Sequence, residues 1–249
     1  MQIVPDWVKK RAGIGGESEK VRKLIKELSL NTVCESATCP NIYECFCKGY
    51  ASFMILGNKC TRGCRFCGVS RLQKTEPPDE QEIKNIATAV KQLKMHYVVI
   101  TSPTRDDLTD GGATHFAEVT RQIRNASPET KIELLIPDFR GNKDNLQTVF
   151  DAKPDIISHN IETVPSLYPL VRQSSDFKTS INILKTIKKN NFVTKSGFML
   201  GLGETREEVL SLMDILKDTG CDYLVIGQYL KPSKDALPVK EFIQEEVFK

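Results

Sequence analysis

The chain has 249 residues, a formal net charge of +3 and 40% hydrophobic residues, which suits one globular domain with a core of its own. Basic and acidic residues are mixed along the chain, so the small positive charge does not indicate nucleic-acid binding. No apolar run reaches the roughly 20 residues of a membrane-spanning helix, and the first residues contain no apolar signal core. We therefore expect a cytoplasmic protein without a nucleic-acid or membrane partner.

Residues 1–50 precede the first expected strand and contain four of the eight cysteines, which predicts a cysteine-rich N-terminal extension. Beyond them, apolar runs rich in β-branched residues recur along the chain. Several are almost continuously apolar, as in Val98-Val99-Ile100, which is typical of parallel strands covered on both faces. The expected strands are residues 52–56, 97–102, 131–137, 155–161, 194–200 and 223–230.

Helical patterns lie between most of the expected strands. Asp79 with Glu82, and Thr205 with Glu208, have the spacing of capping boxes, and apolar residues follow each at helical spacing. Asn142 is placed to cap a third helix, and residues 177–190 have the pattern of a fourth.

The alternation of strands and helices predicts right-handed crossovers and a parallel sheet. Six such units are fewer than the eight of a closed barrel, so we expect a partial (β/α)6 TIM-type barrel of class α/β. The expected domains are an extension at residues 1–50, the barrel at 51–232 and a short, incomplete C-terminal extension at 233–249. Ligands of such barrels bind at the carboxyl ends of the strands.

Seven of the eight cysteines lie between Cys34 and Cys67, and clustered thiols in a reducing compartment favour metal binding over disulfides. Cys60, Cys64 and Cys67 have C-x3-C-x2-C spacing directly after the first expected strand. Three thiolates on a four-iron cubane leave one iron open to another ligand. The neighbouring Lys59, Arg62 and Arg65 are expected to stabilise the thiolates. The alternative is a zinc site or buried free thiols.

A second triplet, Cys34, Cys39 and Cys45, has C-x4-C-x5-C spacing and precedes the first by fifteen residues. Alone, this spacing leaves a zinc site or bystander thiols open. Cys47 and Cys221 lie outside both patterns and are interpreted as bystanders.

The C-x3-C-x-aromatic-C pattern, with Phe66 at the aromatic position, resembles the signature of the radical S-adenosylmethionine (SAM) superfamily. Together with the N-terminal triplet, it resembles the lipoyl synthase family. The resemblance extends over nearly the whole chain, with matching stretches at residues 53–57, 97–102, 105–112, 137–141, 159–163, 194–197, 201–205 and 227–230.

This resemblance implies a sulfurtransferase with two 4Fe-4S clusters and SAM as cofactors. Its reaction inserts two sulfur atoms at C6 and C8 of an octanoyl chain on a lysine of a carrier protein, and the auxiliary cluster at Cys34, Cys39 and Cys45 donates the sulfur. The implied partners are octanoylated lipoyl domains of dihydrolipoyl acyltransferases, the glycine-cleavage H protein, and flavodoxin or ferredoxin as electron donor. Unactivated C–H bonds require reactivity from a cofactor, so no catalytic residue is expected beyond the cluster ligands.

Polar residues at the ends of the expected strands are candidates for SAM contacts. Glu162 suits a ribose diol, because a carboxylate accepts two hydroxyl hydrogen bonds. Arg172 is a candidate for the carrier or the methionine moiety, or else a surface ion pair. Gly111 and Gly112 are alternatively turn glycines, Lys195 alternatively solvates a strand end, and His159 fits a core histidine at least as well as a ligand. The cofactor candidates are Phe66, Thr101, Ser102, Gly111, Gly112, Asn160, Glu162, Lys195 and Ser196.

One departure from the family pattern bears on the auxiliary cluster. Lipoyl synthases end in an R-S-S-Y motif whose serine is a cluster ligand, and this sequence ends at Lys249 without that motif. Three alternatives therefore stay open: another two-cluster radical SAM enzyme such as a biotin synthase-like protein, a non-catalytic iron–sulfur electron-transfer protein, and a zinc-bound interaction module.

Overall fold

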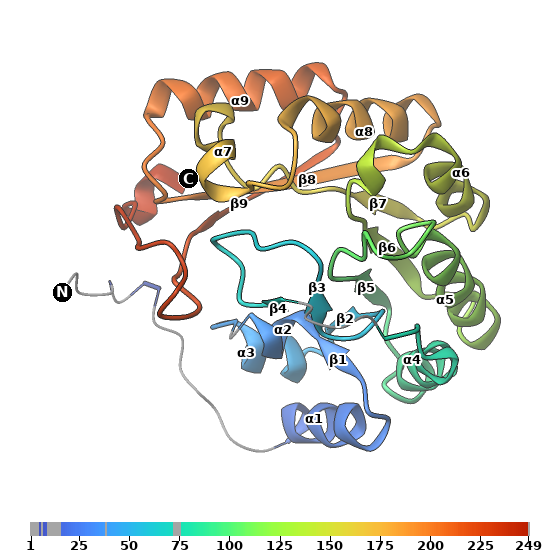
Figure 1. The fold of residues 1–249 in the computed structure, drawn as a ribbon. Coiled ribbons are helices and arrows are strands. Elements are labelled where there is room, and N and C mark those ends of the chain that lie inside the picture. Colours follow the sequence, from blue (N-terminus) through green and yellow to red (C-terminus); the bar gives the residue numbers. More distant parts are fainter. Residues whose placement is uncertain (1–4, 6, 9–15, 38, 72–75, 249) are drawn as a thin grey trace.

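The computed structural model describes residues 5, 7–8, 16–37, 39–71 and 76–248. A seven-stranded sheet, in the order β1-β2-β5-β6-β7-β8-β9, curls into a half-barrel (Figure 1). Neighbouring strands from β2 to β9 are parallel, which confirms the expected α/β partial barrel. Its parallel strands are β2 (Ser52–Met54), β5 (Tyr97–Thr101), β6 (Lys131–Leu135), β7 (Ile156–Ser158), β8 (Val193–Leu200) and β9 (Tyr223–Gln228).

Long helices follow the strands and lie along the outer side of the curved sheet (Figure 1). They are α4 (Glu80–Gln92), α5 (Ala113–Ala126), α6 (Lys143–Asp151), α8 (Phe177–Lys189) and α9 (Arg206–Asp218), with the one-turn helix α7 (Tyr168–Val171) before α8. Within the described part of the chain, no helix has both the length and the apolar composition to cross a bilayer.

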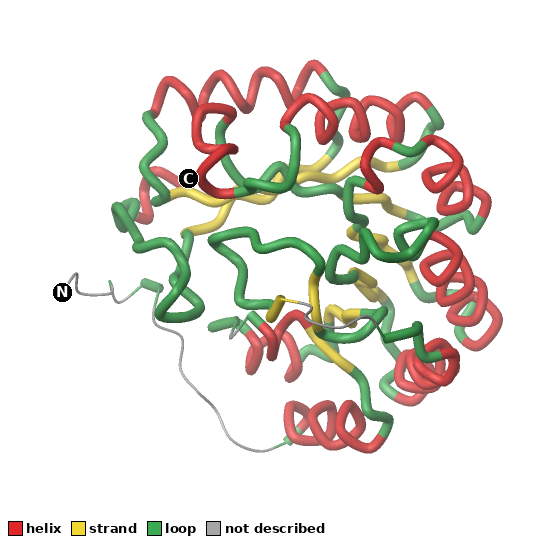
Figure 2. The backbone as a smooth tube through the Cα atoms, viewed as in Figure 1, coloured by secondary structure: helices red, strands yellow, loops and turns green. Residues whose placement is uncertain are grey.

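The N-terminal region adds elements that the sequence analysis did not predict. Strand β1 (Asn31–Thr32) pairs antiparallel with β2 at the edge of the sheet. Around it lie three helices: α1 (Glu17–Glu27), α2 (Val33–Ser36) and α3 (Ile42–Cys47). A separate two-stranded ladder joins β3 (Lys59–Cys60) to β4 (Ser70–Arg71). Mostly loops, rather than long helices, fill the concave side of the sheet (Figure 2).

The caps of the outer helices follow the sequence closely, with one exception. At α9, Thr205 and Glu208 form both halves of a capping box, and Asn142 accepts from the backbone N–H groups of residues 144 and 145. At α4, Asp79 accepts from the backbone N–H of Gln81 as expected. Its expected partner Glu82 instead turns into the core.

Glu82 helps to hold the turn at Leu56. This turn precedes β3 and the loop between β3 and β4, which we call the cysteine loop. The Glu82 carboxylate accepts from the Leu56 backbone N–H at 2.7 Å and lies 3.0 Å from the His115 ring. The Leu56 carbonyl accepts from Arg105 at 3.1 Å. A Cβ atom at Gly112, the N-cap of α5, would lie 2.2 Å from the Leu56 side chain. Leu56 itself has a left-handed φ of 65°, so these contacts hold a strained backbone in place.

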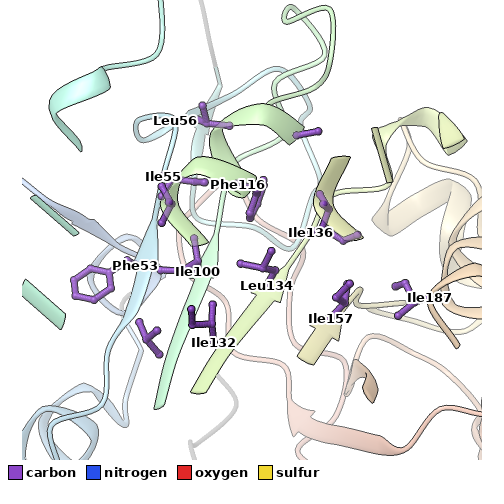
Figure 3. Packing of buried hydrophobic residues seen from close by; sticks show 14 of the residues in the cluster. Phe53, Ile55, Leu56, Ile100, Phe116, Ile132, Leu134, Ile136, Ile157 and Ile187 are labelled. Atoms are coloured by element: carbon purple, nitrogen blue, oxygen red, sulfur yellow. The ribbon is translucent and has the colours of Figure 1, made fainter. Parts of the chain in front are cut away.

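The core lies between the sheet and the outer helices (Figure 3). Alternate strand residues such as Ile100, Leu134 and Ile157 are fully buried there, against side chains such as Phe116 and Ile187. Because successive side chains of a strand point to opposite faces, the residues between them line the concave face. That face holds the polar groups and the cavities.

Candidate active site

Cys60 is the last residue of β3, and Cys64 and Cys67 lie in the loop between β3 and β4. Distant backbone groups fix this loop: the Thr61 N–H donates to the Thr104 carbonyl at 2.9 Å, and the Arg65 N–H donates to the Val171 carbonyl at 3.0 Å. The Cys60 sulfur accepts from the backbone N–H of residue 62, and the Cys67 sulfur from that of residue 69, both at 3.4 Å. Such N–H groups favour thiolates over thiols.

Arg62, between the first two cysteines, anchors the loop to the barrel. Its buried guanidinium makes paired hydrogen bonds with Asp106, at 2.8 and 2.9 Å, and with Asp138, and a further one with Ser175 at 3.0 Å. Burial would raise the pKa of Asp138, but hydrogen bonds from Arg62 outweigh it and hold that pKa below its usual value. Two carboxylates thus neutralise this arginine.

The expectation that Lys59, Arg62 and Arg65 surround the thiolates with positive charge therefore needs correction. Arg62 is committed to two aspartates, and the exposed Lys59 lies 3.4 Å from Glu76. Arg62 still lowers the pKa of Cys64, but a second arginine has the larger effect. Burial raises the pKa of the Cys64 thiol, and Arg172 opposes that rise more strongly than Arg62 does.

A cavity of about 360 Å³ opens beside this triplet, at the carboxyl ends of the strands. It brings together all three cysteines and most of the candidate SAM contacts. Those contacts are Phe66, Thr101, Ser102, Asn160, Glu162 and Arg172. We call this space the SAM cavity.

Glu162 is held in the SAM cavity by the strand next to it. Its backbone N–H donates to the Gly197 carbonyl at 3.0 Å and its carbonyl accepts from the Met199 N–H at 2.9 Å, with a left-handed φ of 72°. Burial raises the pKa of Glu162, while Arg172 and a hydrogen bond with Asn160 oppose the rise. Gly197 leaves room for this arrangement, because a Cβ atom there would lie 3.0 Å from the Asn160 side-chain oxygen.

Arg172 is 8% exposed, so the alternative of a surface ion pair is wrong. Its Nη1 donates to the Asn160 carbonyl at 2.8 Å and to the Tyr168 hydroxyl at 3.0 Å. Its Nε, and the hydroxyl of Ser102, are among the few buried polar side-chain atoms of the described residues without a partner. Both residues line the SAM cavity, so these atoms are available to a polar ligand.

Four other candidate contacts do not line this cavity. Lys195 points to a lower level of the barrel, where its ammonium pairs with Glu133 at 2.8 Å. Ser196 is fully buried on the opposite face of β8 and donates to the His159 carbonyl at 2.9 Å. Gly111 and Gly112 form the turn into α5, and Gly112 borders a different groove.

His159 takes the structural role that the sequence analysis had weighed for it. Its ring lies between the Ile136 carbonyl, at 2.9 Å, and the Ser180 hydroxyl, at 3.0 Å. Burial lowers the pKa of His159 to about 4, so the ring is neutral near pH 7. It is a satisfied core histidine.

The segment that contains the second triplet is held by hydrogen bonds between residues close in the sequence. Cys34 lies in α2 and Cys45 in α3, and the Cys39 N–H between them donates to the Cys34 carbonyl at 2.9 Å. Thr32 caps α2 by accepting from the Glu35 N–H at 3.2 Å. Burial raises the pKa of Cys34, and the nearby Cys39 and Cys45 thiols add to the rise, so the three lie within electrostatic reach of one another.

A second cavity, of about 430 Å³, lies against this triplet. Cys34 and Cys45 line it, together with residues of the loop before β2 and of the first half of β5. We call it the acyl cavity, after the role that is proposed for it below. Its other lining residues are Tyr50, Ala51, Ser52, Tyr97 and Val99.

The two cavities adjoin along the same three elements. In α2, Cys34 lines the acyl cavity, whereas Val33 and the C-cap Ala37 line the SAM cavity. In β2 the two lining residues are Ser52 and Met54, and in β5 they are Val99 and Thr101. Because these strand residues are two apart, each pair projects from the same face of its strand. The two cavities therefore follow one another along the concave face.

The described residues, which include all eight cysteines, contain no group of three His, Cys, Asp or Glu side chains that converges on a single metal ion. A zinc centre requires such convergence. In an iron–sulfur cubane each thiolate binds a different iron, so the sulfur atoms stay apart.

Comparison with known proteins identifies the family. The model of the radical SAM superfamily matches residues 54–226. The lipoyl synthase of Caldicellulosiruptor saccharolyticus is 52% identical over 246 residues, which cover 98% of this chain and 86% of the relative. That of Chlorobium phaeovibrioides is 47% identical, with 98% and 86% coverage. The chain belongs to the lipoyl synthase family.

Solved structures show the same fold at low sequence identity. The FeFe-hydrogenase maturase HydG from Carboxydothermus hydrogenoformans has a TM-score of 0.63 and 14% identity, with coverage of 90% of this chain and 60% of HydG. A methylornithine synthase has a TM-score of 0.62 and 16% identity, with coverage of 94% and 69%. The half-barrel fold is therefore shared with these two structures.

Radical SAM membership implies one 4Fe-4S cluster and SAM, and the SAM cavity fits both. Cys60, Cys64 and Cys67 would supply three sulfur ligands, and the sulfur atoms of Cys60 and Cys67 already accept hydrogen bonds from backbone N–H groups. The unpartnered Arg172 Nε suits a carboxylate, and the unpartnered Ser102 hydroxyl suits a polar ligand atom.

Several residues of this lipoyl synthase-family site were missed from the sequence. Met54, Met199 and Tyr229 line the SAM cavity without belonging to a polar motif. Tyr229 is nearly fully buried, and its hydroxyl donates to the Leu237 carbonyl at 2.8 Å. The Leu237 N–H in turn donates to the Arg65 carbonyl at 2.8 Å, so the segment after β9 contacts the cysteine loop directly. The position of Met54, Met199 and Tyr229 at or near the ends of the expected strands is the sequence signal that could have indicated them.

Proposed function

We propose that this chain inserts sulfur at C6 and C8 of an octanoyl chain attached to a lysine of a carrier protein. Membership in the lipoyl synthase family supports the reaction class. The observation that carries the proposal is that the SAM cavity, lined by Cys60, Cys64 and Cys67, and the acyl cavity, lined by Cys34 and Cys45, lie next to each other along the same strands. A substrate chain in this space lies near both triplets at once.

In this proposal Cys60, Cys64 and Cys67 hold the cluster that binds SAM, and a second 4Fe-4S cluster is held by the other triplet. When bound, these groups supply the electron that splits SAM into methionine and a 5′-deoxyadenosyl radical, and the sulfur that enters the substrate. The ligands of the second cluster are Cys34, Cys39 and Cys45.

The remaining work of the chain is to orient SAM and exclude water. Glu162, on its fixed backbone, accepts hydrogen bonds from the ribose hydroxyls, and Asn160 steadies its carboxylate. Arg172 directs its free Nε to the SAM carboxylate. Phe66, in the cysteine loop, packs against the small apolar cluster that contains Tyr229 and adds apolar surface beside the SAM cavity.

We place the reaction in the cytoplasm, with octanoylated lipoyl domains or the glycine-cleavage H protein as substrate and flavodoxin or ferredoxin as electron donor. These partners follow from the family resemblance. The carrier lysine must bring its acyl chain into the concave side of the sheet, since both cavities open there.

The test is an anaerobic reconstitution with iron and sulfide, followed by incubation with SAM, a reductant and an octanoyl-lysine peptide. Mass spectrometry is expected to detect a product that has gained two sulfur atoms, together with 5′-deoxyadenosine. Deoxyadenosine without any sulfur gain would contradict the proposed function but leave the SAM cavity in place.

A further inference from the structure

Arg172 is a buried cation whose hydrogen bonds leave its Nε free. Its Nη1 donates to the Asn160 carbonyl at 2.8 Å and to the Tyr168 hydroxyl at 3.0 Å, and neither partner carries a charge. Glu162 acts on it electrostatically, without a hydrogen bond. Among the described residues, Nε has no partner. Because a buried cation gains most from a hydrogen-bonded anion, this Nε suits the carboxylate of a ligand.

The Tyr168 hydroxyl is itself held by a second hydrogen bond. It belongs to α7 and donates to the Ser180 hydroxyl of α8 at 3.2 Å. The Tyr168 ring stands edge-on to Phe177, with 5.3 Å between the ring centroids, and its centroid lies 5.4 Å from the guanidinium carbon of Arg172. Because Tyr168 is 4% exposed and packed on both sides, it has little freedom to turn away from the arginine.

His159 sets the direction of these hydrogen bonds. Its Nδ1 lies 2.9 Å from the Ile136 carbonyl, which can only accept, so Nδ1 carries a proton. Burial lowers the pKa of His159 to about 4, so near pH 7 its Nε2 has no hydrogen and accepts from the Ser180 hydroxyl at 3.0 Å. Ser180 has then used its one hydrogen and must accept from Tyr168. Each donor in the row thus has one acceptor, from Arg172 through Tyr168 and Ser180 to the histidine ring.

We propose that Tyr168, Ser180 and His159 are positioning residues that hold Arg172 with its Nε directed at the SAM carboxylate. We call these three residues the arginine support. The inference rests on the proposed function and deepens it, because it names the residues that prepare the site for SAM. Neither Tyr168 nor Ser180 is among the described residues that line the SAM cavity, so both act on SAM through the arginine. Without the support, the guanidinium keeps only its short hydrogen bond to the Asn160 carbonyl, and SAM binding must also order the arginine.

The experiment measures how tightly the reconstituted full chain binds SAM. Equilibrium dialysis is done anaerobically and without a reductant, so that SAM stays intact. Tyr168→Phe keeps the ring and removes the hydroxyl, and the Kd of SAM is expected to rise by about 5-fold, the factor that one hydrogen bond accounts for. With a reductant, the KM for SAM in 5′-deoxyadenosine formation is expected to rise by a larger factor than kcat falls, because the loss is in binding. An unchanged Kd in Tyr168→Phe would overturn the inference.

A double variant tests whether Ser180 acts through Tyr168. Ser180→Ala alone should also raise the Kd of SAM, because the Tyr168 hydroxyl loses its acceptor. In the Tyr168→Phe background, the same substitution should change the Kd by less than about 2-fold, since the hydrogen bond between the two residues is already gone. Effects of the two substitutions that simply multiply would contradict a connected row. If Ser180→Ala does not fold, Tyr168→Phe alone decides the inference.

Thr120→Val is the matched control. It removes another fully buried hydroxyl, which donates to the Phe116 carbonyl at 2.8 Å within α5. Helix α5 contributes none of the described residues that line the SAM cavity. Thermal unfolding followed by circular dichroism should show a loss of stability in this variant, while the Kd of SAM stays the same. An equal rise of the Kd in Thr120→Val and Tyr168→Phe would show a general effect of lost stability and would overturn the inference.

The outcome is separate from that of the proposed function. If the unsubstituted chain binds SAM but adds no sulfur to an octanoyl-lysine peptide, the proposed function fails, and the Kd values still decide the role of the arginine support. Arg172→Met should raise the Kd of SAM by more than about 10-fold, because it removes a charged hydrogen-bond donor. A Kd unaffected by Arg172→Met would remove the arginine from the SAM site, and the support with it.

Discussion

The two cysteine triplets reach their positions by different physical means. The loop that contains Cys60, Cys64 and Cys67 is tied to groups more than forty residues away in the sequence, through Arg62 and through backbone bonds to residues 104 and 171. The triplet of Cys34, Cys39 and Cys45 is built on two short helices, α2 and α3, joined by bonds between near neighbours.

Because of this difference, the two triplets are expected to be sensitive to substitutions in different parts of the chain. The loop depends on the folded barrel, because its anchors exist only when β5, β6 and the segment after α7 are in place. The helical triplet depends on local caps and on a few packed side chains, such as Phe46 of α3, which is fully buried under Arg22. We therefore expect distant substitutions to disturb the loop and near ones to disturb the helical triplet.

The largest expected effect comes from one cysteine of each triplet. Cys64→Ala should abolish both 5′-deoxyadenosine and sulfur insertion, because it removes a ligand from the SAM cavity. Cys34→Ala should abolish sulfur insertion and leave SAM cleavage in place. Liquid chromatography with mass spectrometry measures both products in one reaction, and full sulfur insertion by Cys34→Ala would refute the division of roles. Cys221→Ala, remote from both triplets, is the matched control.

The second prediction concerns the loop anchor. Asp138→Ala leaves the buried Arg62 with one carboxylate instead of two, and it should lower the free energy of unfolding by about 3 kcal/mol. Urea unfolding of the metal-free protein, followed by circular dichroism, measures the change. Asp214→Ala, an exposed position on α9, is the comparison and should change the free energy of unfolding by less than about 0.5 kcal/mol. Equal urea midpoints for the two variants would contradict the role of Asp138 as an anchor of the cysteine loop.

The same anchor predicts a dependence on acid. Arg62 holds the pKa of Asp138, and that of Asp106, below their usual range despite burial. A carboxyl group with a lowered folded-state pKa stabilises the protein above its unfolded-state pKa of about 3.9, and that stabilisation is lost as the pH falls through the folded-state value. The urea concentration at the unfolding midpoint of the metal-free protein should therefore decrease as the pH is lowered below about 4. Asp138→Asn should flatten this decline, and an unaltered pH profile would contradict it.

The smallest effect is expected at the helical triplet. Thr32→Ala removes the N-cap of α2 and should cost about 1 kcal/mol of unfolding free energy. Thr32→Ser keeps the capping oxygen and should retain most of the stability. If Thr32→Ala instead cost as much as Asp138→Ala, the helical triplet would depend on more than local structure.

Much of the barrel was predictable from the sequence, because its strands and long helices have strong periodic patterns. Each of the expected strands is present in the sheet, and the caps at Asn142 and Thr205 form as predicted. Strand β1 has two residues and helix α2 has four, and the N-terminal sequence around them shows no periodic pattern that would indicate them. They were therefore missed.

The site was less predictable, because tertiary contacts decide where a polar side chain points. Lys195 and Ser196 are adjacent in β8, so they face opposite sides of the sheet and cannot both face one ligand. The sequence did not reveal that Lys195 pairs with Glu133, which lies sixty-two residues earlier. The charge of Arg62 was expected at the thiolates for the same reason, since its aspartate partners are forty-four and seventy-six residues away.

The turn at Leu56 precedes the cysteine loop, so residues far from the cysteines also affect where that loop lies. The N–H, the carbonyl and the side chain of Leu56 each meet a different distant residue: Glu82, Arg105 and Gly112. A methyl group added at residue 112 would have to displace Leu56, which lies four residues before Cys60. The lack of a side chain at Gly112 thus helps to fix the turn that leads into the cysteine loop.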